Sequence, residues 1–216
     1  MPLLKLILIG IGAYLIGNIN PAIIIGRIYG IDIRKEGSGN AGMTNTIRVI
    51  GLGAGIAVFA VDVLKAFTSV TLGNLIAGDA SGGMIAFACV VLGHCYPAIY
   101  GFKGGKGVAA SLGAALALNW QSALIALAVA GVVFLVSGRR MSIASIIAVI
   151  TYPALVYYFV DDKMIFFFAI AAVLFLVLQH AANIKRIAHG EEESLTIGHA
   201  GHDKESEIEK KEGTKE

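Results

Sequence analysis

Seven apolar stretches fill most of the first 190 residues of this 216-residue chain. A helix needs about 20 apolar residues to cross about 30 Å of hydrocarbon, and most of the stretches are close to that length or longer. The apolar residues run continuously and do not alternate with polar ones, which argues against a β-barrel. The pattern predicts an all-α, polytopic membrane helical bundle of seven transmembrane helices, the fourth of them short, at 3–29, 51–77, 83–100, 106–118, 121–137, 142–159 and 163–185.

The composition supports a membrane protein and excludes a soluble enzyme. Apolar residues make up 56% of the chain and charged residues only 15%, whereas a soluble domain has roughly 45–50% apolar and about 25% charged residues. The charge is also concentrated at one end, because residues 191–216 hold nine of the 15 acidic groups. We therefore expect a single membrane-embedded domain at 1–190, followed by a polar, charged cytoplasmic tail at 191–216.

The basic residues predict the orientation of the bundle. With the N-terminus outside, the loops on the cytoplasmic side hold ten positive charges, at Arg27, Arg34, Lys35, Arg48, Lys103, Lys106, Arg139, Arg140, Lys185 and Arg186. The outer side then holds only Lys5 and Lys163, as the positive-inside rule requires. An odd number of spans also places the C-terminus in the cytoplasm. No small-residue cleavage site follows the first stretch, so we expect a retained span and not a signal peptide.

Two polar interruptions are expected to shape the helices. The sequence Asn18-Ile19-Asn20-Pro21 should bend the first span, because proline lacks a backbone donor. The sequence Asn119-Trp120-Gln121 should separate the fourth span from the fifth.

The first polar cluster on the predicted cytoplasmic side contains three glycines in six residues, followed by Arg48. Glycines allow a loop to turn its N–H groups toward an anion, and arginine offers a planar fork that suits phosphate. Neighbouring side chains add donors at Ser38, Asn40, Thr44 and Asn45. The cluster predicts a phosphate site, and a flexible connecting loop is the alternative.

The second cluster runs from Gly93-His94 to the glycine- and lysine-rich segment Gly101-Phe102-Lys103-Gly104-Gly105-Lys106-Gly107. It is not the nucleotide-binding P-loop, whose glycine spacing and preceding strand are missing. A glycine loop that opens into a helix still offers free N–H groups to an anion. A basic loop that only sets the orientation is the alternative.

The third cluster ends the last span. His180 and Asn183 are three residues apart, so they share a helical face, and Lys185 and Arg186 follow. His180 can act as a general base or a phosphate donor, or it can simply pack between helices.

Asp62 and Lys65 lie inside the second predicted span, also three residues apart. An unpaired charge there is costly, so we expect a structural ion pair, with direct substrate contact as the alternative.

Together the three clusters resemble the signature motifs of the bacterial acyl-phosphate:glycerol-3-phosphate acyltransferase family. The resemblance covers residues 1 to about 192 and rests on the clusters above, with Pro97, Ile184, Gly190 and Glu192 as further matches. It implies transfer of a fatty acyl group from acyl phosphate to the 1-hydroxyl of sn-glycerol 3-phosphate, giving lysophosphatidic acid and inorganic phosphate in phospholipid biosynthesis. The implied location is the bacterial cytoplasmic (inner) membrane, with the active site on the cytoplasmic side.

The expected site residues fall into two groups. The catalytic group is Ser38, Arg48, Lys106, His180 and Asn183. The group that binds substrate or phosphate is Gly39, Asn40, Thr44, Asn45, His94, Lys103, Gly104, Gly105 and Gly107. The hydroxyl proton goes either to His180 or to an oxygen of a substrate phosphate.

The expected partners are acyl phosphate, sn-glycerol 3-phosphate and membrane lipid, with the chain acting as a monomer. We expect no cofactor and no metal, because acyl phosphate is already activated, and we expect no nucleic acid. A membrane transporter of a phosphorylated small molecule is the rival function. It predicts polar residues across the whole membrane and an internal repeat, and neither is found in the sequence.

Overall fold

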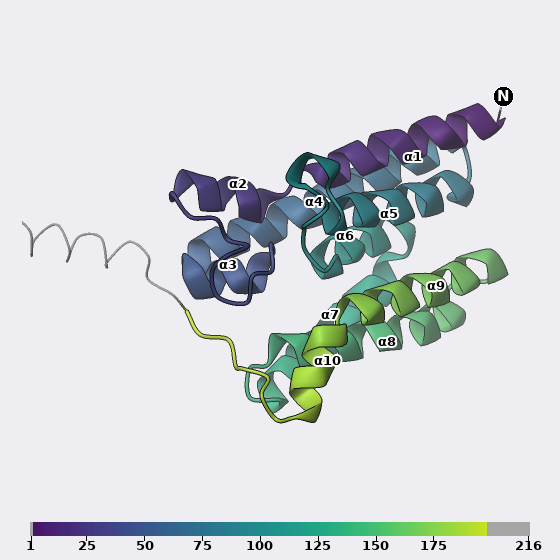
Figure 1. Ribbon diagram of the computed structural model, residues 1–216. Coiled ribbons are helices and arrows are strands. Elements are labelled where there is room, and N and C mark those ends of the chain that lie inside the picture. Colours follow the sequence, from purple (N-terminus) through teal and green to yellow (C-terminus); the bar gives the residue numbers. More distant parts are fainter. Residues whose placement is uncertain (1, 198–216) are drawn as a thin grey trace, which may run out of the picture.

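The computed structural model describes residues 2–197, and every regular element in this range is helical (Figure 1). The helices are α1 (Pro2–Asn18), α2 (Pro21–Ile28), α3 (Met43–Val49), α4 (Leu52–Ala77), α5 (Ala80–Cys95), the short 3-10 helix η1 (Ala98–Tyr100), α6 (Val108–Leu118), α7 (Trp120–Val136), α8 (Met141–Phe159), α9 (Lys163–Gln179) and α10 (Ala181–Ala188). Of the predicted tail, residues 191–197 are described and residues 198–216 lie outside the described residues.

Four helical segments of the described chain are long and apolar enough to cross a membrane: Leu3–Ile28, Leu52–Ala77, Ala80–Tyr100 and Met141–Phe159. A fifth arises if α9 and α10, which meet at an angle of 61°, form one bent span. The apolar helices α6 and α7 are shorter. The all-α, multi-span architecture is therefore confirmed, and the count of seven stays a prediction.

Side-chain caps set the helix boundaries where the sequence has polar interruptions. Asn20 accepts a hydrogen bond from the Ile23 N–H at 3.1 Å, and Pro21 occupies the first turn of α2, where no backbone donor is needed. Asn119 caps α7 by accepting from the Ser122 N–H at 2.9 Å. The predicted breaks in the first span and before the fifth are thus present, because each asparagine satisfies the donors of a new helix.

The helices pack through small residues and turn their large apolar residues outward. Gly17 of α1 faces Gly93 of α5, and a Cβ on Gly17 would come within 3.0 Å of the Gly93 Cα. Only glycine permits the two backbones to approach this closely. Outward-facing residues such as Leu75 and Val136 are 73% and 77% exposed. Small residues inside and large apolar ones outside are typical of helices packed in lipid.

The helices form two groups that enclose the site between them. Figure 1 shows α1, α4, α5 and α6 packed together, with α7, α8, α9 and α10 forming a second group beside them. Contacts of α6 with α7 and of α5 with α9 join the two groups. The loop before α3, the loop before α6 and the bend before α10 lie at the same end of the bundle, where their residues line one cavity.

Candidate active site

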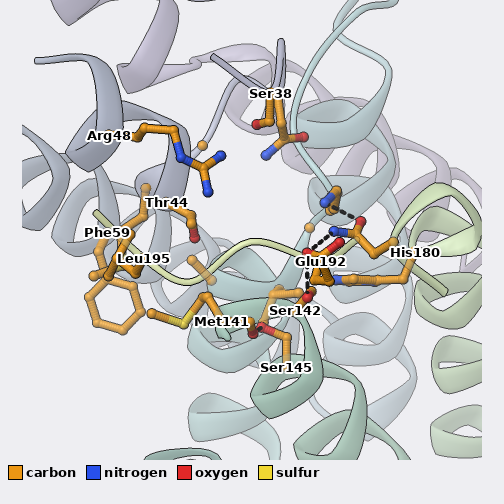
Figure 2. Close-up of a pocket in the computed structure, with 18 of the residues that line it drawn as sticks. Ser38, Thr44, Arg48, Phe59, Met141, Ser142, Ser145, His180, Glu192 and Leu195 are labelled. Atoms are coloured by element: carbon orange, nitrogen blue, oxygen red, sulfur yellow. Dashed lines mark hydrogen bonds between the residues drawn. The ribbon is translucent and has the colours of Figure 1, made fainter. Parts of the chain in front are cut away.

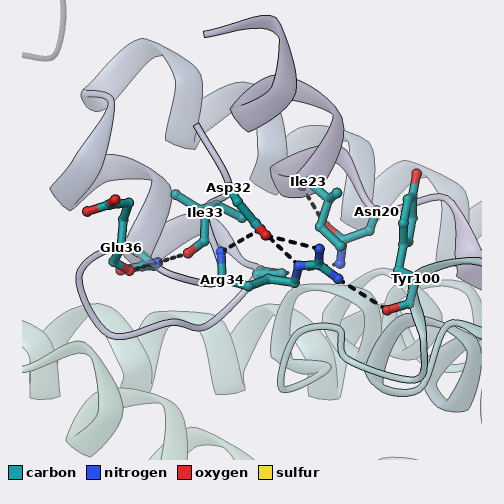
Figure 3. Close-up of polar contacts among 9 residues, drawn as sticks. Asn20, Ile23, Asp32, Ile33, Arg34, Glu36 and Tyr100 are labelled. Atoms are coloured by element: carbon teal, nitrogen blue, oxygen red, sulfur yellow. Dashed lines mark hydrogen bonds and ion pairs between the residues drawn. The ribbon is translucent and has the colours of Figure 1, made fainter. Parts of the chain in front are cut away.

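The first loop, residues 29–42, is held in shape by Asn45 and Arg34. The buried Asn45 amide donates to the carbonyls of Ile33 and Glu36, both at 3.0 Å, and accepts from the Ser38 N–H at 2.8 Å. Arg34 donates to the Tyr100 carbonyl at 3.1 Å while it pairs with Asp32 (Figure 3). Asn45 therefore shapes the loop, and its amide has no N–H left to donate to a substrate phosphate.

The second loop, residues 101–107, is anchored by its own backbone to the end of α5. The N–H of Gly104 donates to the Cys95 carbonyl at 3.1 Å, and that of Gly105 to the His94 carbonyl at 3.2 Å. A Cβ on Gly105 would lie 2.8 Å from the Ala41 carbonyl oxygen, so this glycine lets the two loops touch. The N–H groups of Gly104 and Gly105 are thus engaged by protein carbonyls, and phosphate binding by these two glycines stays a prediction.

The third element is the bend between α9 and α10. His180 ends α9 and starts α10, which runs off at 61°. His180, Asn183 and Arg186 follow one another at intervals of three residues, and all three line the same cavity. The shared face predicted for His180 and Asn183 therefore extends one turn further, to Arg186.

A cavity of about 160 Å³ lies where these three elements meet, with loops on one side and α4 and α8 on the other (Figure 2). Ten of the residues predicted from sequence line it: Ser38, Asn40, Thr44, Arg48, Asp62, His94, Lys106, Gly107, His180 and Asn183. Residues that are distant in sequence thus converge on one polar cavity.

Six predicted residues do not line this cavity: Gly39, Asn45, Lys65, Lys103, Gly104 and Gly105. Lys103 is exposed on the outer side of its loop. Gly39 has φ of +70°, and its N–H donates to the Glu36 carbonyl at 2.9 Å, so it supports the turn of the first loop. Lys65 was expected to form an ion pair and does so with Asp62, and substrate binding by the other five stays a prediction.

Lys106, Asn183 and Glu192 form a hydrogen-bonded row in the cavity. The Lys106 ammonium donates to Asn183 Oδ1, and Asn183 Nδ2 donates to Glu192 Oε1 at 2.8 Å. Burial, followed by the nearby positive charges of Arg186 and Arg48, lowers the pKa of Lys106 to about 8, while Glu192 opposes that shift. An anion placed here would therefore stabilise the protonated lysine.

Glu192 accepts hydrogen bonds from three side chains in the cavity. It accepts from Ser142 Oγ at 2.6 Å and from Arg186 Nε at 2.8 Å, in addition to Asn183. Burial alone would raise the pKa of Glu192, but these three donors together lower it. Glu192 falls at the start of the polar tail, so the composition did not indicate that it belongs to the site. Only the family resemblance did. Ser142 had no sequence signal beyond its position after Arg139-Arg140.

The segment 191–195, here called the strap, lies across the cavity. Its backbone is held by Arg140 Nε, which donates to the Glu192 carbonyl at 3.0 Å, and by the Leu195 N–H, which donates to the Arg139 carbonyl at 2.9 Å. Glu193 reaches Arg48, with 3.4 Å between Oε2 and Nη2. The Nε atom of Arg48 is buried and has no hydrogen-bond partner within residues 2–197. The Nε–H group of Arg48 can thus donate one further hydrogen bond.

His180 is buried, and its contact with α9 defines the tautomer of the neutral ring. Nδ1 lies 2.8 Å from the Leu176 carbonyl oxygen. A carbonyl can only accept, so Nδ1 carries the hydrogen and Nε2 carries the lone pair. A lone pair on the edge of a polar cavity suits a proton acceptor.

Asp62, Lys65 and His94 form a buried charged cluster behind the cavity. Asp62 Oδ1 lies 2.7 Å from Lys65 Nζ and 3.1 Å from His94 Nδ1. Lys65 also donates to the carbonyls of Gly17 and Ile19, at 3.2 and 2.6 Å. The three side chains are at most 5% exposed. The cluster therefore ties α4 to α5 and to the end of α1, just below the second loop.

The donor set of the cavity suits an anion. Arg48, Lys106 and Arg186 bring three cations to one space, beside the amide of Asn183 and the hydroxyl of Ser38. Within the described part of the chain, no group of three or more His, Cys, Asp or Glu residues is placed to hold a metal ion. Three cations beside amide and hydroxyl donors are a donor set that suits a phosphate group.

Comparison with protein families and their members gives consistent results. The family model described as glycerol-3-phosphate acyltransferase matches residues 7–190. A glycerol-3-phosphate acyltransferase of Thermoanaerobacter sp. (strain X514) is 42% identical over 190 residues, which cover 88% of this chain and 95% of the relative. One of Clostridioides difficile (strain 630) is 39% identical over 201 residues, covering 90% of this chain and 98% of the relative.

Two solved structures share the fold. Both are crystal structures of PlsY, an integral membrane glycerol 3-phosphate acyltransferase. Its glycerol 3-phosphate form has a TM-score of 0.82 and 34% identity, covering 88% of this chain and 96% of the other. Its lysophosphatidic acid form has a TM-score of 0.79 and 33% identity, covering 88% and 94%.

Proposed function

This chain belongs to the glycerol-3-phosphate acyltransferase family, and from that premise we propose that its acyl donor is an acyl phosphate. The enzyme acylates glycerol 3-phosphate. In the proposed reaction, a fatty acyl group moves to the 1-hydroxyl of sn-glycerol 3-phosphate, and the products are lysophosphatidic acid and inorganic phosphate. The rival function, transport of a phosphorylated molecule, has no support from the relatives.

One observation carries the choice of donor: three cations, Arg48, Lys106 and Arg186, converge on one cavity. Three carboxylates also line it, but Asp62 is paired with Lys65, Glu192 accepts from three side chains, and Glu193 is 76% exposed. Glycerol 3-phosphate is a dianion, and an acyl phosphate brings a second anionic phosphate beside it. Three cations at short range suit such a pair of phosphates better than they suit one alone.

The chemistry requires no covalent enzyme intermediate. The 1-hydroxyl oxygen of glycerol 3-phosphate attacks the acyl carbonyl carbon, a new C–O bond forms, and the bond from that carbon to the phosphate oxygen breaks. The electron pair leaves with phosphate, whose negative charge the cations stabilise. Ser38, Gly107, Asn40 and Thr44 line the same cavity as the cations. In the proposed reaction, Asn40 and Thr44 would contact the glycerol end.

The hydroxyl proton has two acceptors to choose from. Nε2 of His180 carries a lone pair at the cavity, and an oxygen of the leaving phosphate is the alternative. A His180→Gln variant separates them. Full activity with a rate that is flat around neutral pH assigns the proton to the substrate, and loss of activity together with the acid limb of the pH profile assigns it to His180.

The proposal includes how the enzyme sits in the membrane. The ten positive charges counted above support seven spans, with the N-terminus outside and the cavity and C-terminus in the bacterial cytoplasm. The proposal also takes the chain to act as a monomer. Labelling of single cysteines from either side of sealed vesicles tests the orientation, and a cysteine at Lys103 that reacts only from outside would overturn it.

The direct test supplies the purified protein in lipid with palmitoyl phosphate and radiolabelled glycerol 3-phosphate, without ATP or coenzyme A. We expect lysophosphatidic acid together with an equal amount of inorganic phosphate. The matched controls are Lys106→Ala, which removes a cation from the cavity, and Lys103→Ala, which removes one outside it. Product from palmitoyl-coenzyme A but none from palmitoyl phosphate would leave the acyltransferase activity intact and refute the donor.

A further inference from the structure

A second cavity, of about 150 Å³, continues from the polar one into the bundle. Five residues line both cavities, so the two share a boundary: Phe59, Val108, Ala109, Met141 and Ser145. Beyond this boundary the walls are almost wholly apolar, and they come from α5, α6, α7, α8 and α9. A narrow apolar cavity joined to a phosphate site fits a molecule with an anionic head and one hydrocarbon chain.

The lining residues show how deep this cavity reaches. Along α8, Met141 and Ser145 lie at the shared boundary, and Ala148, Val149 and Tyr152 line only the apolar part. Met141 and Tyr152 are eleven residues apart in one helix, which at 1.5 Å per residue is about 16 Å of depth. Tyr152 is the last residue of α8 to line the cavity.

An aromatic side chain of α5 also lines the apolar cavity, and it packs against a second aromatic ring. Phe87 of α5 lines the cavity, and its ring packs edge to face against Phe168 of α9, with 5.2 Å between the ring centroids. Small residues also line the cavity, among them Ala115 of α6 and Ala126 of α7. The cavity thus has several alanines in its walls, and the bulky aromatic side chains of Phe87 and Tyr152 line it as well.

We propose that Tyr152 and Phe87 form the floor of the acyl-chain cavity and set the longest acyl chain that the enzyme accepts efficiently. This inference rests on the proposed function, because the chain in question is that of the acyl donor. A chain whose last carbon reaches the floor fills the cavity, and each additional methylene must fold back or leave between the helices. Tyr152 is therefore a specificity-determining residue, although it lies far from the reacting atoms.

The experiment compares kcat/KM for octanoyl, dodecanoyl, palmitoyl and stearoyl phosphate in competition. In the parent enzyme kcat/KM rises with chain length, by about fourfold for each methylene that is newly buried, and stops rising when the floor is reached. In Tyr152→Ala, we expect kcat/KM to be highest for a longer acyl chain than in the parent enzyme. Ala126→Phe, which fills the cavity from its wall, moves the maximum to a shorter chain.

Each variant has a matched control that makes the same exchange on the outer face of the same helix. Tyr158 of α8 is 80% exposed, so Tyr158→Ala should leave the chain-length profile unchanged. Ala128 of α7 is exposed and does not line the cavity, so Ala128→Phe should do the same. The two cavity variants are expected to shift the preferred chain length in opposite directions. A general loss of folding cannot produce both shifts, so it is distinguished from the proposed effect.

Two outcomes would overturn the inference, and they are distinguishable. If all variants show the chain-length profile of the parent enzyme, the acyl chain lies in the surrounding lipid. Tyr152 and Phe87 then do not limit its length, while the proposed function stands. If the parent enzyme turns over no acyl phosphate of any length, the proposed donor is wrong and the inference falls with it.

Discussion

Asn183 donates to Glu192 at 2.8 Å through its amide nitrogen, and this bond turns the amide oxygen toward the Lys106 ammonium. Glu192 therefore orients the side chain that holds the lysine. It also contributes a negative charge that keeps Lys106 protonated.

Replacement of Glu192 by glutamine should shift the pH dependence as well as the rate. The lost charge removes a group that raises the pKa of Lys106, so the alkaline limb of kcat/KM should move to lower pH. Arg186 also loses its charged partner, and we expect kcat/KM to fall by about tenfold or more. Glu191→Gln is the control, because Glu191 is exposed and does not line the cavity. An unchanged alkaline limb would show that Glu192 acts only on structure.

The lowered pKa of Lys106 predicts that kcat/KM of the parent enzyme falls at alkaline pH. Burial lowers the pKa of Lys106 to about 8, so the ammonium loses its proton as the pH rises through that value. Since only the charged form attracts phosphate, kcat/KM should decline as the pH rises above this value. In Lys106→Arg the limb should disappear, because guanidinium stays protonated. A limb that persists at the same pH in this variant belongs to another group.

Removal of the Lys106 side chain should cause the largest loss among the loop variants. Lys106→Ala leaves phosphate charge uncompensated in a partly buried cavity, and we expect kcat/KM to drop by about 100- to 1,000-fold. The exposed Lys103, three residues earlier, lies outside the cavity, so Lys103→Ala should stay within about fivefold of the parent. Steady-state kinetics with palmitoyl phosphate compares the two, and equal losses would mean that general loop charge is what matters.

Glu193 should compete weakly with substrate for Arg48. Its carboxylate lies 3.4 Å from the guanidinium and is 76% exposed, so the pair contributes at most about 1 kcal/mol. Glu193→Gln should therefore lower KM for glycerol 3-phosphate by up to about fivefold and leave kcat unchanged. A raised KM would instead mean that Glu193 helps to hold the strap in its binding position.

The buried Asp62–Lys65 pair gives a prediction about stability. Asp62→Asn leaves the Lys65 ammonium buried without its counter-ion, and we expect a loss of about 3–5 kcal/mol in unfolding free energy. Asp62→Asn combined with Lys65→Met should recover much of this loss, which thermal unfolding in detergent can measure. If Asp62→Asn keeps full stability and loses only activity, Asp62 contacts substrate instead.

The sequence predicted local features well, because their signals are local. The break at Asn18–Pro21 and the separation at Asn119 both arise from an asparagine that caps the next helix. The face shared by His180 and Asn183 follows from helical periodicity, and both line the cavity. Nine of the ten predicted site residues that line this cavity belong to the three clusters, which meet at the same end of the bundle, and the tenth is Asp62 of α4.

The sequence could not predict which polar groups are already engaged. The Gly104 and Gly105 N–H groups bind carbonyls at the end of α5, and Asn45 binds its own loop. Those pairings depend on three-dimensional proximity, which composition and spacing do not encode. For the same reason Ser142 was not identified, since its partner Glu192 is 50 residues away.

The bend at His180 has a consequence for how this region can change over evolutionary time. His180, Asn183 and Arg186 keep their common direction only because each is one short turn from the next. A single inserted or deleted codon between His180 and Asn183 would rotate everything downstream by about 100°. Lineages should therefore accept length changes in the α8–α9 connection, residues 160–162, far more readily than between His180 and Arg186, because that connection does not line the cavity.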